Sequence, residues 1–139
     1  MRPTLPLIAT TLALAACAPA GERPDQASSA DDVPPVTVLG EERSCINRDA
    51  IRQSIVRSDK VIDFEMRGGK VYRSTLPNRC PSLDLQRSIT YNTEINQFCQ
   101  TEIVYVLENF AGRLQRGAGC ALGPFVPVEY ADEDEPEDS

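Results

Sequence analysis

Four cysteines, Cys45, Cys80, Cys99 and Cys120, constrain the fold of this 139-residue chain most strongly. An even number of cysteines in a small exported domain is typical of a disulfide framework, so the sequence predicts two bridges. A structural zinc site would need close pairs such as Cys-x-x-Cys, which these four cysteines do not form. Each bridge is expected to stabilise the domain by roughly 3–4 kcal/mol, a large share for a domain of this size.

The pairing of these cysteines stays open between two arrangements. If Leu107 faces Leu114 across a turn at residues 110–113, the same register brings the third cysteine near the fourth. That register favours Cys99–Cys120 together with Cys45–Cys80. The competing pairing, Cys45–Cys120 with Cys80–Cys99, would tie the two ends of the domain together.

The N-terminal residues 1–16 are expected to be a signal peptide. Arg2 precedes an apolar run at residues 5–16, which is too short to span a bilayer but has the length of a signal-peptide core. The run ends in Leu-Ala-Ala-Cys17, which resembles the lipobox of bacterial lipoproteins. The resemblance implies that Cys17 is acylated and becomes the mature N-terminus, so that lipid anchors the chain to a membrane. Since Ala18, and not Asp, follows that cysteine, it also implies the periplasmic face of the outer membrane.

Charge and composition divide the remaining chain into a tether, a domain and a tail. Residues 17–40, rich in Pro, Ala, Ser and Asp, are predicted to form a disordered tether. Residues 129–139 carry seven acids and no base, which predicts a disordered acidic tail. Residues 41–128, the predicted four-cysteine domain, carry ten acids and twelve bases, so the formal charge of −7 belongs to the tails. A mildly basic domain without a basic block argues against nucleic acid as a partner.

The domain is expected to be mainly β, with α+β as the alternative, in a small antiparallel meander or a partly open barrel. Ile62, Phe64 and Met66 alternate with charged residues, which indicates a strand with one buried face. A three-residue turn with one left-handed glycine at Gly68-Gly69 is expected to pair Met66 with Tyr72, Ile62 with Leu76 and Glu65 with Arg73. A turn at Ser58-Asp59 would pair Ile51 with Met66 and Ile55 with Ile62.

Three further elements are predicted outside this meander. Residues 103–107 are apolar on both faces and predict a central strand. Residues 89–91 predict a short strand, and residues 47–50 a single helical turn.

Few enzyme mechanisms fit the composition, and neither catalysis nor a cofactor is expected. The chain has no histidine, which excludes a Ser-His-Asp triad and histidine metal ligands. It also lacks phosphate and dinucleotide loops. Asp63 and Glu65 remain as a carboxylate pair on one strand face, about 7 Å apart, as in glycosidases. A flat exposed face cannot desolvate an acid, so these two are expected to be solvated and paired with Arg52 and Arg73.

Two candidate binding surfaces each have a simpler interpretation. One is a ridge of cations for an anionic glycolipid or a wall carboxylate, with scattered surface arginines as the alternative; its members would be Arg43, Arg48, Arg52 and Arg57. The other is an aromatic sugar platform, although its side chains are expected to lie in the core: Tyr72, Tyr91, Tyr105 and Phe98.

Residues 45–125 resemble a family of small, uncharacterised exported proteins of proteobacteria. The matching elements are Cys45-Ile46, the strand at 62–64, the hairpin at 68–72, the run from Leu76 to Leu83 around Cys80, Phe98-Cys99, and the segment 120–125. The resemblance implies the four-cysteine domain boundaries and carries no activity. An Asp that is typical just after the third cysteine is replaced here by Gln100-Thr101-Glu102.

The sequence therefore favours a non-catalytic, membrane-anchored envelope lipoprotein that contacts a protein or an anionic glycolipid. The first alternative is an inhibitor or small-ligand-binding lipoprotein acting on a cell-wall enzyme. Such an inhibitor would insert a protruding loop, at Gly68-Gly69 or residues 117–119, into a cleft. The second alternative is a carboxylate-based hydrolase built on the acid pair.

Overall fold

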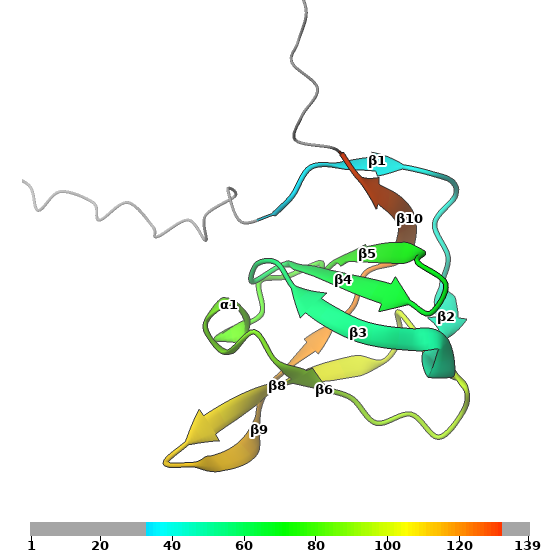
Figure 1. Ribbon diagram of the computed structural model, residues 1–139. Helices are drawn as coiled ribbons and strands as arrows, with labels where there is room; N and C mark the ends of the chain where they lie inside the picture. The colour runs from blue at the N-terminus through cyan, green and yellow to red at the C-terminus, as the bar shows by residue number, and fades with distance from the viewer. Residues whose placement is uncertain (1–32, 132–139) are drawn as a thin grey trace, which may run out of the picture.

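A computed structural model describes residues 33–131, which form antiparallel sheets around one core (Figure 1). The elements are β1 (Val36–Val38), β2 (Cys45–Asn47), a 3₁₀ turn (Arg48–Ala50), β3 (Ile51–Val56), β4 (Val61–Met66), β5 (Val71–Thr75), α1 (Leu83–Gln86), β6 (Ile89–Thr90), β7 (Gln97–Cys99), β8 (Ile103–Phe110), β9 (Arg113–Ala121) and β10 (Phe125–Tyr130). A five-stranded sheet has the order β1-β10-β5-β4-β3, β2 pairs with β7, and a third sheet has the order β6-β8-β9. The sheets are open, which confirms the mainly β prediction.

The predicted meander is β3-β4-β5, with one pairing confirmed and one corrected between β3 and β4. Ile51 lies opposite Met66 as expected, but Ile62 pairs with Val56 instead of Ile55. A β-bulge between Ile51 and Gln53 inserts one extra residue, and this insertion accounts for the difference.

The β4–β5 register differs from the prediction by two residues. Tyr72 lies opposite Phe64, and Arg73 lies opposite Asp63 instead of Glu65. Ile62 pairs with Ser74, not with Leu76. The turn has the predicted three residues but lies one residue earlier, at 67–69, because the Met66 amide donates to the Lys70 carbonyl at 2.8 Å. Both Gly68 (φ 97°) and Gly69 (φ 93°) are left-handed, where only one was expected. A shift of two residues keeps each side chain on its predicted face.

The other predicted elements are present. β8 is the central strand of its sheet, and β6 covers two of the three residues predicted there. The predicted helical turn is present as the 3₁₀ turn. Asn47 caps its N-terminus, because the Asn47 side-chain oxygen accepts a 3.2 Å hydrogen bond from the Ala50 amide.

The core lies between the sheets and centres on three phenylalanines. Phe64, Phe98 and Phe125 are fully buried, and their ring centres lie 5.5–5.8 Å apart. Tyr72 is also buried as expected, while Tyr91 and Tyr105 are only half-buried. Tyr91 stacks on Phe98 at 4.2 Å, so the predicted assignment of Tyr91 to the core side is supported by contact.

The fold extends beyond residues 41–128 at both ends, which corrects the predicted boundaries. β1 lies inside the predicted tether and pairs with β10, where Val36 is opposite Tyr130. The last two residues of β10 belong to the predicted acidic tail. The Pro34-Pro35 pair accounts for this difference, because prolines directly before so short a strand are typical of a tether.

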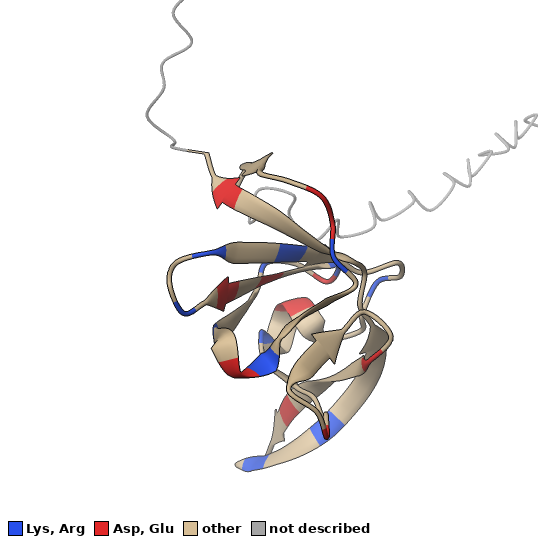
Figure 2. Ribbon diagram, turned by 90° about the vertical axis from the view of Figure 1, so that its right-hand side faces the viewer, with Lys and Arg blue, Asp and Glu red and all other residues tan. Residues whose placement is uncertain are grey.

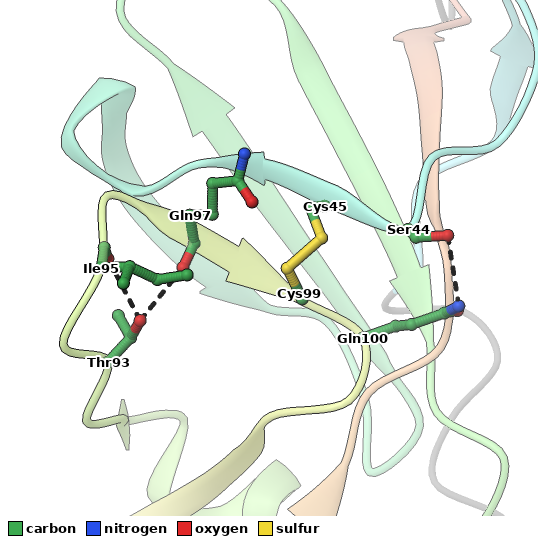
Figure 3. The surroundings of a disulfide bond; sticks show 7 residues. All are labelled: Ser44, Cys45, Thr93, Ile95, Gln97, Cys99 and Gln100. Carbon is green, nitrogen blue, oxygen red and sulfur yellow. Dashed lines mark hydrogen bonds between the residues drawn. A yellow bond between two sulfur atoms is a disulfide. The ribbon is translucent and has the colours of Figure 1, made fainter.

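The disulfides are Cys45–Cys99 and Cys80–Cys120, so both pairings considered from the sequence are wrong. The predicted hairpin register placed Cys99 near Cys120, but Cys99 ends β7, which pairs with β2. Cys45 lies directly opposite Cys99 in that two-stranded sheet, with their Cα atoms 4.0 Å apart (Figure 3). The turn after Cys99 leads the chain away from its partner strand before β8 begins.

Each bridge joins parts of the fold that are distant in the chain. Ser44 and Gln100 flank the Cys45–Cys99 bridge, and the backbone amide of Gln100 donates to the Ser44 carbonyl at 2.9 Å. Figure 3 shows their side-chain hydrogen bond, from Gln100 Nε2 to Ser44 Oγ at 3.5 Å. Cys80, which follows β5, joins the end of the meander to Cys120 on β9. The second bridge therefore fastens the three-stranded sheet to the five-stranded one.

Replacement of Ser74 by Ala is expected to lower the free energy of unfolding by roughly 1–3 kcal/mol. The buried Ser74 hydroxyl donates to the Gly123 carbonyl at 2.9 Å and accepts from the Gly123 amide at 3.1 Å, so alanine leaves two buried backbone groups without this partner. Urea unfolding measures the loss. Thr75→Ala, on the next and exposed residue, is the control, and an equal loss in both variants would contradict the assignment.

Candidate functional site

The acid pair predicted on β4 is divided between two environments. Asp63 is fully buried, which corrects the expectation that it is solvated. Its Oδ1 accepts from Arg73 Nε at 2.7 Å. Its Oδ2 accepts from Arg73 Nη2 and from Arg57 Nε, both at 2.9 Å, and from the Tyr130 hydroxyl at 3.1 Å. Both carboxylate oxygens are therefore occupied.

Strand pairing explains why this cluster (Asp63, Arg57, Arg73 and Tyr130) assembles. Arg73 lies opposite Asp63 in the β4–β5 ladder, and Arg57 follows β3 at the turn into β4. Tyr130 arrives from the end of β10, where its hydroxyl also accepts from Arg57 Nη2 at 2.8 Å. Arg73 Nη1 donates to the Pro34 carbonyl at 3.0 Å, so the segment before β1 is fastened to the same cluster.

The electrostatics of the cluster keep Asp63 ionised. Burial opposes its charged form, but hydrogen bonds from Arg73 and Arg57 outweigh that effect and hold the pKa of Asp63 below its ordinary value. Burial also raises the pKa of the Tyr130 hydroxyl, which stays protonated and able to donate. An acid held ionised and fully hydrogen-bonded has no proton to give and no free oxygen to act as a base.

Glu65, the other member of the pair, pairs with Arg52 as predicted. Gln53 Nε2 also donates to Glu65 Oε2 at 2.6 Å. The hydrogen bonds from Arg52 and Gln53 lower the pKa of Glu65. The expected partnership of Arg73 is with Asp63 instead, because of the two-residue register difference.

The predicted arginine ridge is largely neutralised by carboxylates. Arg48 pairs with Asp49, Arg52 with Glu65, and Arg57 with Asp63. Arg43, the fourth member, pairs through its backbone with Phe125, and no ion pair of its side chain occurs among residues 33–131. The four arginines therefore do not present a row of free cations.

The β8–β9 hairpin extends away from the rest of the fold (Figure 1). We define the hairpin tip as residues 109–114. Its turn is at Ala111 (φ 50°) and Gly112 (φ 77°), and positive φ at both central residues makes it a tight two-residue turn. Leu114 therefore lies opposite Asn109, and not opposite Leu107 as predicted.

The hairpin tip exposes two large apolar side chains. Phe110 is 72% exposed and Leu114 is 70% exposed, and Phe110 is the largest of the exposed apolar residues in the described part of the chain. The sequence predicts the turn at residues 110–113 but places the protruding loops at Gly68-Gly69 and at residues 117–119. The available signal was an aromatic residue and a leucine that flank Ala-Gly within an otherwise polar stretch.

A groove of about 400 Å³ lies between the segment that precedes β2, the start of β5, and β10. Leu39, Val71 and Val128 give it an apolar floor, while Glu41, Glu42, Arg43 and Lys70 bring both charge signs to it. The hydrolase alternative requires a concave site that holds Asp63, Glu65 or Glu102, and none of these three lines the groove.

Several predicted features lie outside the described residues: the signal peptide (1–16), Cys17, residues 17–32 of the tether and residues 132–139 of the tail. Within residues 33–131, no helix is long and apolar enough to cross a membrane. The same range holds no group of three or more side chains suited to bind a metal ion.

Comparison of the chain with protein families, with curated proteins and with solved structures finds no match.

Proposed function

We propose that this chain is a non-catalytic, lipid-anchored envelope protein whose β domain contacts its partner through the hairpin tip. The exposure of Phe110 and Leu114 at the end of a protruding hairpin carries the proposal. Large apolar side chains gathered at one extremity are typical of contact surfaces, where aromatic residues contribute much of the binding energy.

The rest of the proposal draws on the cysteines and the acids. Two disulfides favour an oxidising compartment outside the cytoplasm. The lipobox-like ending at Cys17 supports membrane anchorage, and Ala18 supports the outer membrane. The ion pairs of Asp63 and Glu65 favour a structural role for both acids, so the hydrolase alternative loses its candidate pair.

Inhibition of a cell-wall enzyme is the second candidate, because a narrow protruding tip has the shape needed to enter a cleft. The tip is neither of the two loops that the sequence predicts for this role, but it meets the same requirement of a protruding loop that can enter a cleft. The two candidates share one contact surface and differ in what receives it.

A test removes the acyl anchor, so that association depends on the domain alone. The variant starts at residue 17, so that it lacks the predicted signal peptide, and it carries Cys17→Ala. We expect it to co-sediment with purified envelopes. Adding Phe110→Ser and Leu114→Ser should reduce the affinity by about tenfold or more, because truncated hot-spot residues cost at least about 2 kcal/mol. Ile95→Ser is the matched control, since Ile95 is 59% exposed but lies in the β6–β7 connection.

The variants must keep their fold for this comparison to count. Because both tip side chains are exposed, their substitution should change the free energy of unfolding by less than about 0.5 kcal/mol. Equal sedimentation of the tip variant and the Ile95 control would contradict the proposal.

A further inference from the structure

We infer that the hairpin tip inserts into the anionic face of a phospholipid leaflet. This inference rests on the proposed function, in which the tip is the contact surface and Cys17 holds the chain at a membrane. It goes further by naming the partner.

The two apolar side chains of the tip leave the hairpin on opposite faces. Phe110 lies opposite Arg113, and Leu114 lies opposite Asn109 on the neighbouring pair of the ladder. Successive pairs project to opposite sides of a β ribbon. A flat protein surface would cover one of these side chains and leave the other in water. A lipid leaflet surrounds the tip and buries both.

The charges of the hairpin tip are mostly basic. The apex residues Ala111 and Gly112 carry no charge, Arg113 lies opposite Phe110 in the last pair before the turn, and Arg116 lies farther back, opposite Leu107. Figure 2 shows basic residues towards the free end of this hairpin. Among residues 107–117, Glu108 is the single acid, so this segment has a net charge of +1. Arg116 lies behind both apolar side chains, at the depth of anionic headgroups, and the long side chain of Arg113 can extend back to the same headgroups while its stem stays beside Phe110.

The backbone of the turn is hydrogen-bonded within the hairpin. The Gly112 amide donates to the Asn109 side-chain oxygen at 3.1 Å, and the β ladder continues to the last pair before the turn. An amide left without a partner would oppose entry into the leaflet. Arg116 is held near the ribbon, with its guanidinium 5.2 Å from the centre of the Tyr105 ring.

Weak insertion is sufficient for a chain that is already anchored. Two side chains and two cations give modest affinity to a free domain, but a tether raises the effective concentration of the tip at the membrane. The groove beside β10 is less suited to an anionic membrane, because acidic and basic side chains both line it around its apolar residues.

Tryptophan fluorescence tests the inference without background, because the chain has no tryptophan. Phe110→Trp is placed in the chain of residues 17–139 with Cys17→Ala, and Ile95→Trp in the same background is the control. Each protein is titrated with vesicles of phosphatidylglycerol and phosphatidylethanolamine, and with vesicles of phosphatidylcholine alone. Brominated acyl chains then report whether the indole reaches the hydrocarbon.

We expect a blue shift and quenching by brominated lipid at position 110 but not at position 95. Partitioning should be at least about tenfold stronger into the anionic vesicles than into phosphatidylcholine vesicles. The double variant Arg113→Gln with Arg116→Gln should bind the anionic vesicles on the order of 30-fold more weakly. Unchanged melting temperatures show that these exposed substitutions leave the fold intact.

The failures of the two proposals are distinguishable. No shift at position 110, or equal partitioning into both vesicle types, would overturn the lipid inference. If the chain still co-sediments with envelopes through Phe110 and Leu114, the proposed contact surface stands and its partner is a protein cleft. If envelope binding is also independent of the tip, both proposals are wrong.

Discussion

Asp63→Asn is expected to lower the free energy of unfolding by about 3 kcal/mol at pH 7. The substitution removes the negative charge shared by Arg57 and Arg73 in a buried position, and the loss of one partner of a buried ion pair typically costs about 3–5 kcal/mol. The lower end applies because the Arg57 side chain is 23% exposed and keeps some hydration. Glu65→Gln is the matched control on the same strand. Its partner Arg52 is 64% exposed, so the expected loss is below about 1 kcal/mol.

The pH dependence of unfolding follows from the same ion pairs. The pKa of Asp63 is lower in the folded chain than in the unfolded chain, so its contribution is present above the unfolded value, near about 4. That contribution is lost as the pH falls through the folded value. The wild type should therefore lose stability below about pH 5, and Asp63→Asn should lose less over the same range. Urea unfolding at pH 7, 5 and 3 measures both effects. Equal slopes for the two proteins would show that Asp63 has an ordinary pKa.

Removal of the Cys80–Cys120 bridge is expected to lower the free energy of unfolding by about 4 kcal/mol. The bridge closes a sequence separation of 40 residues, and the loop-entropy estimate for that length gives this value. Cys80→Ala with Cys120→Ala avoids a free thiol that could mispair. Because the bridge joins β9 to the meander, the variant should also lose amide protection in β8 and β9 first.

Guanidinium unfolding and hydrogen exchange of the double variant measure these effects. Peptide mapping of the unreduced wild type supplies the control, with Cys45 linked to Cys99 and Cys80 linked to Cys120. A Cys45–Cys80 peptide in the native protein would contradict this connectivity directly.

Local sequence patterns were sufficient to predict much of the fold. Alternation of Ile62, Phe64 and Met66 defined the buried face of β4, and the glycines after it fixed a hairpin. The Asn47 cap marked the 3₁₀ turn. These features depend on residues that are close in the chain, where turn chemistry and periodicity act.

Local sequence patterns do not predict contacts between segments that are distant in the chain. The β2–β7 pairing joins strands on either side of the meander, and without it the hairpin register suggested the wrong disulfides. Burial of Asp63 depends on Tyr130, which is 67 residues away, and on the Pro34 segment. Alternation on β4 assigned Asp63 to the outer face, and it could not show that another part of the chain covers that face.

Photo-cross-linking in intact cells tests the central claim most directly, that the hairpin tip is the contact surface. A photoreactive phenylalanine analogue at position 110 of the acylated full chain should give adducts at several times the yield of the same analogue at position 95. Both positions are exposed, so collision with bulk components is matched between them. Equal yields from the two positions would contradict the account.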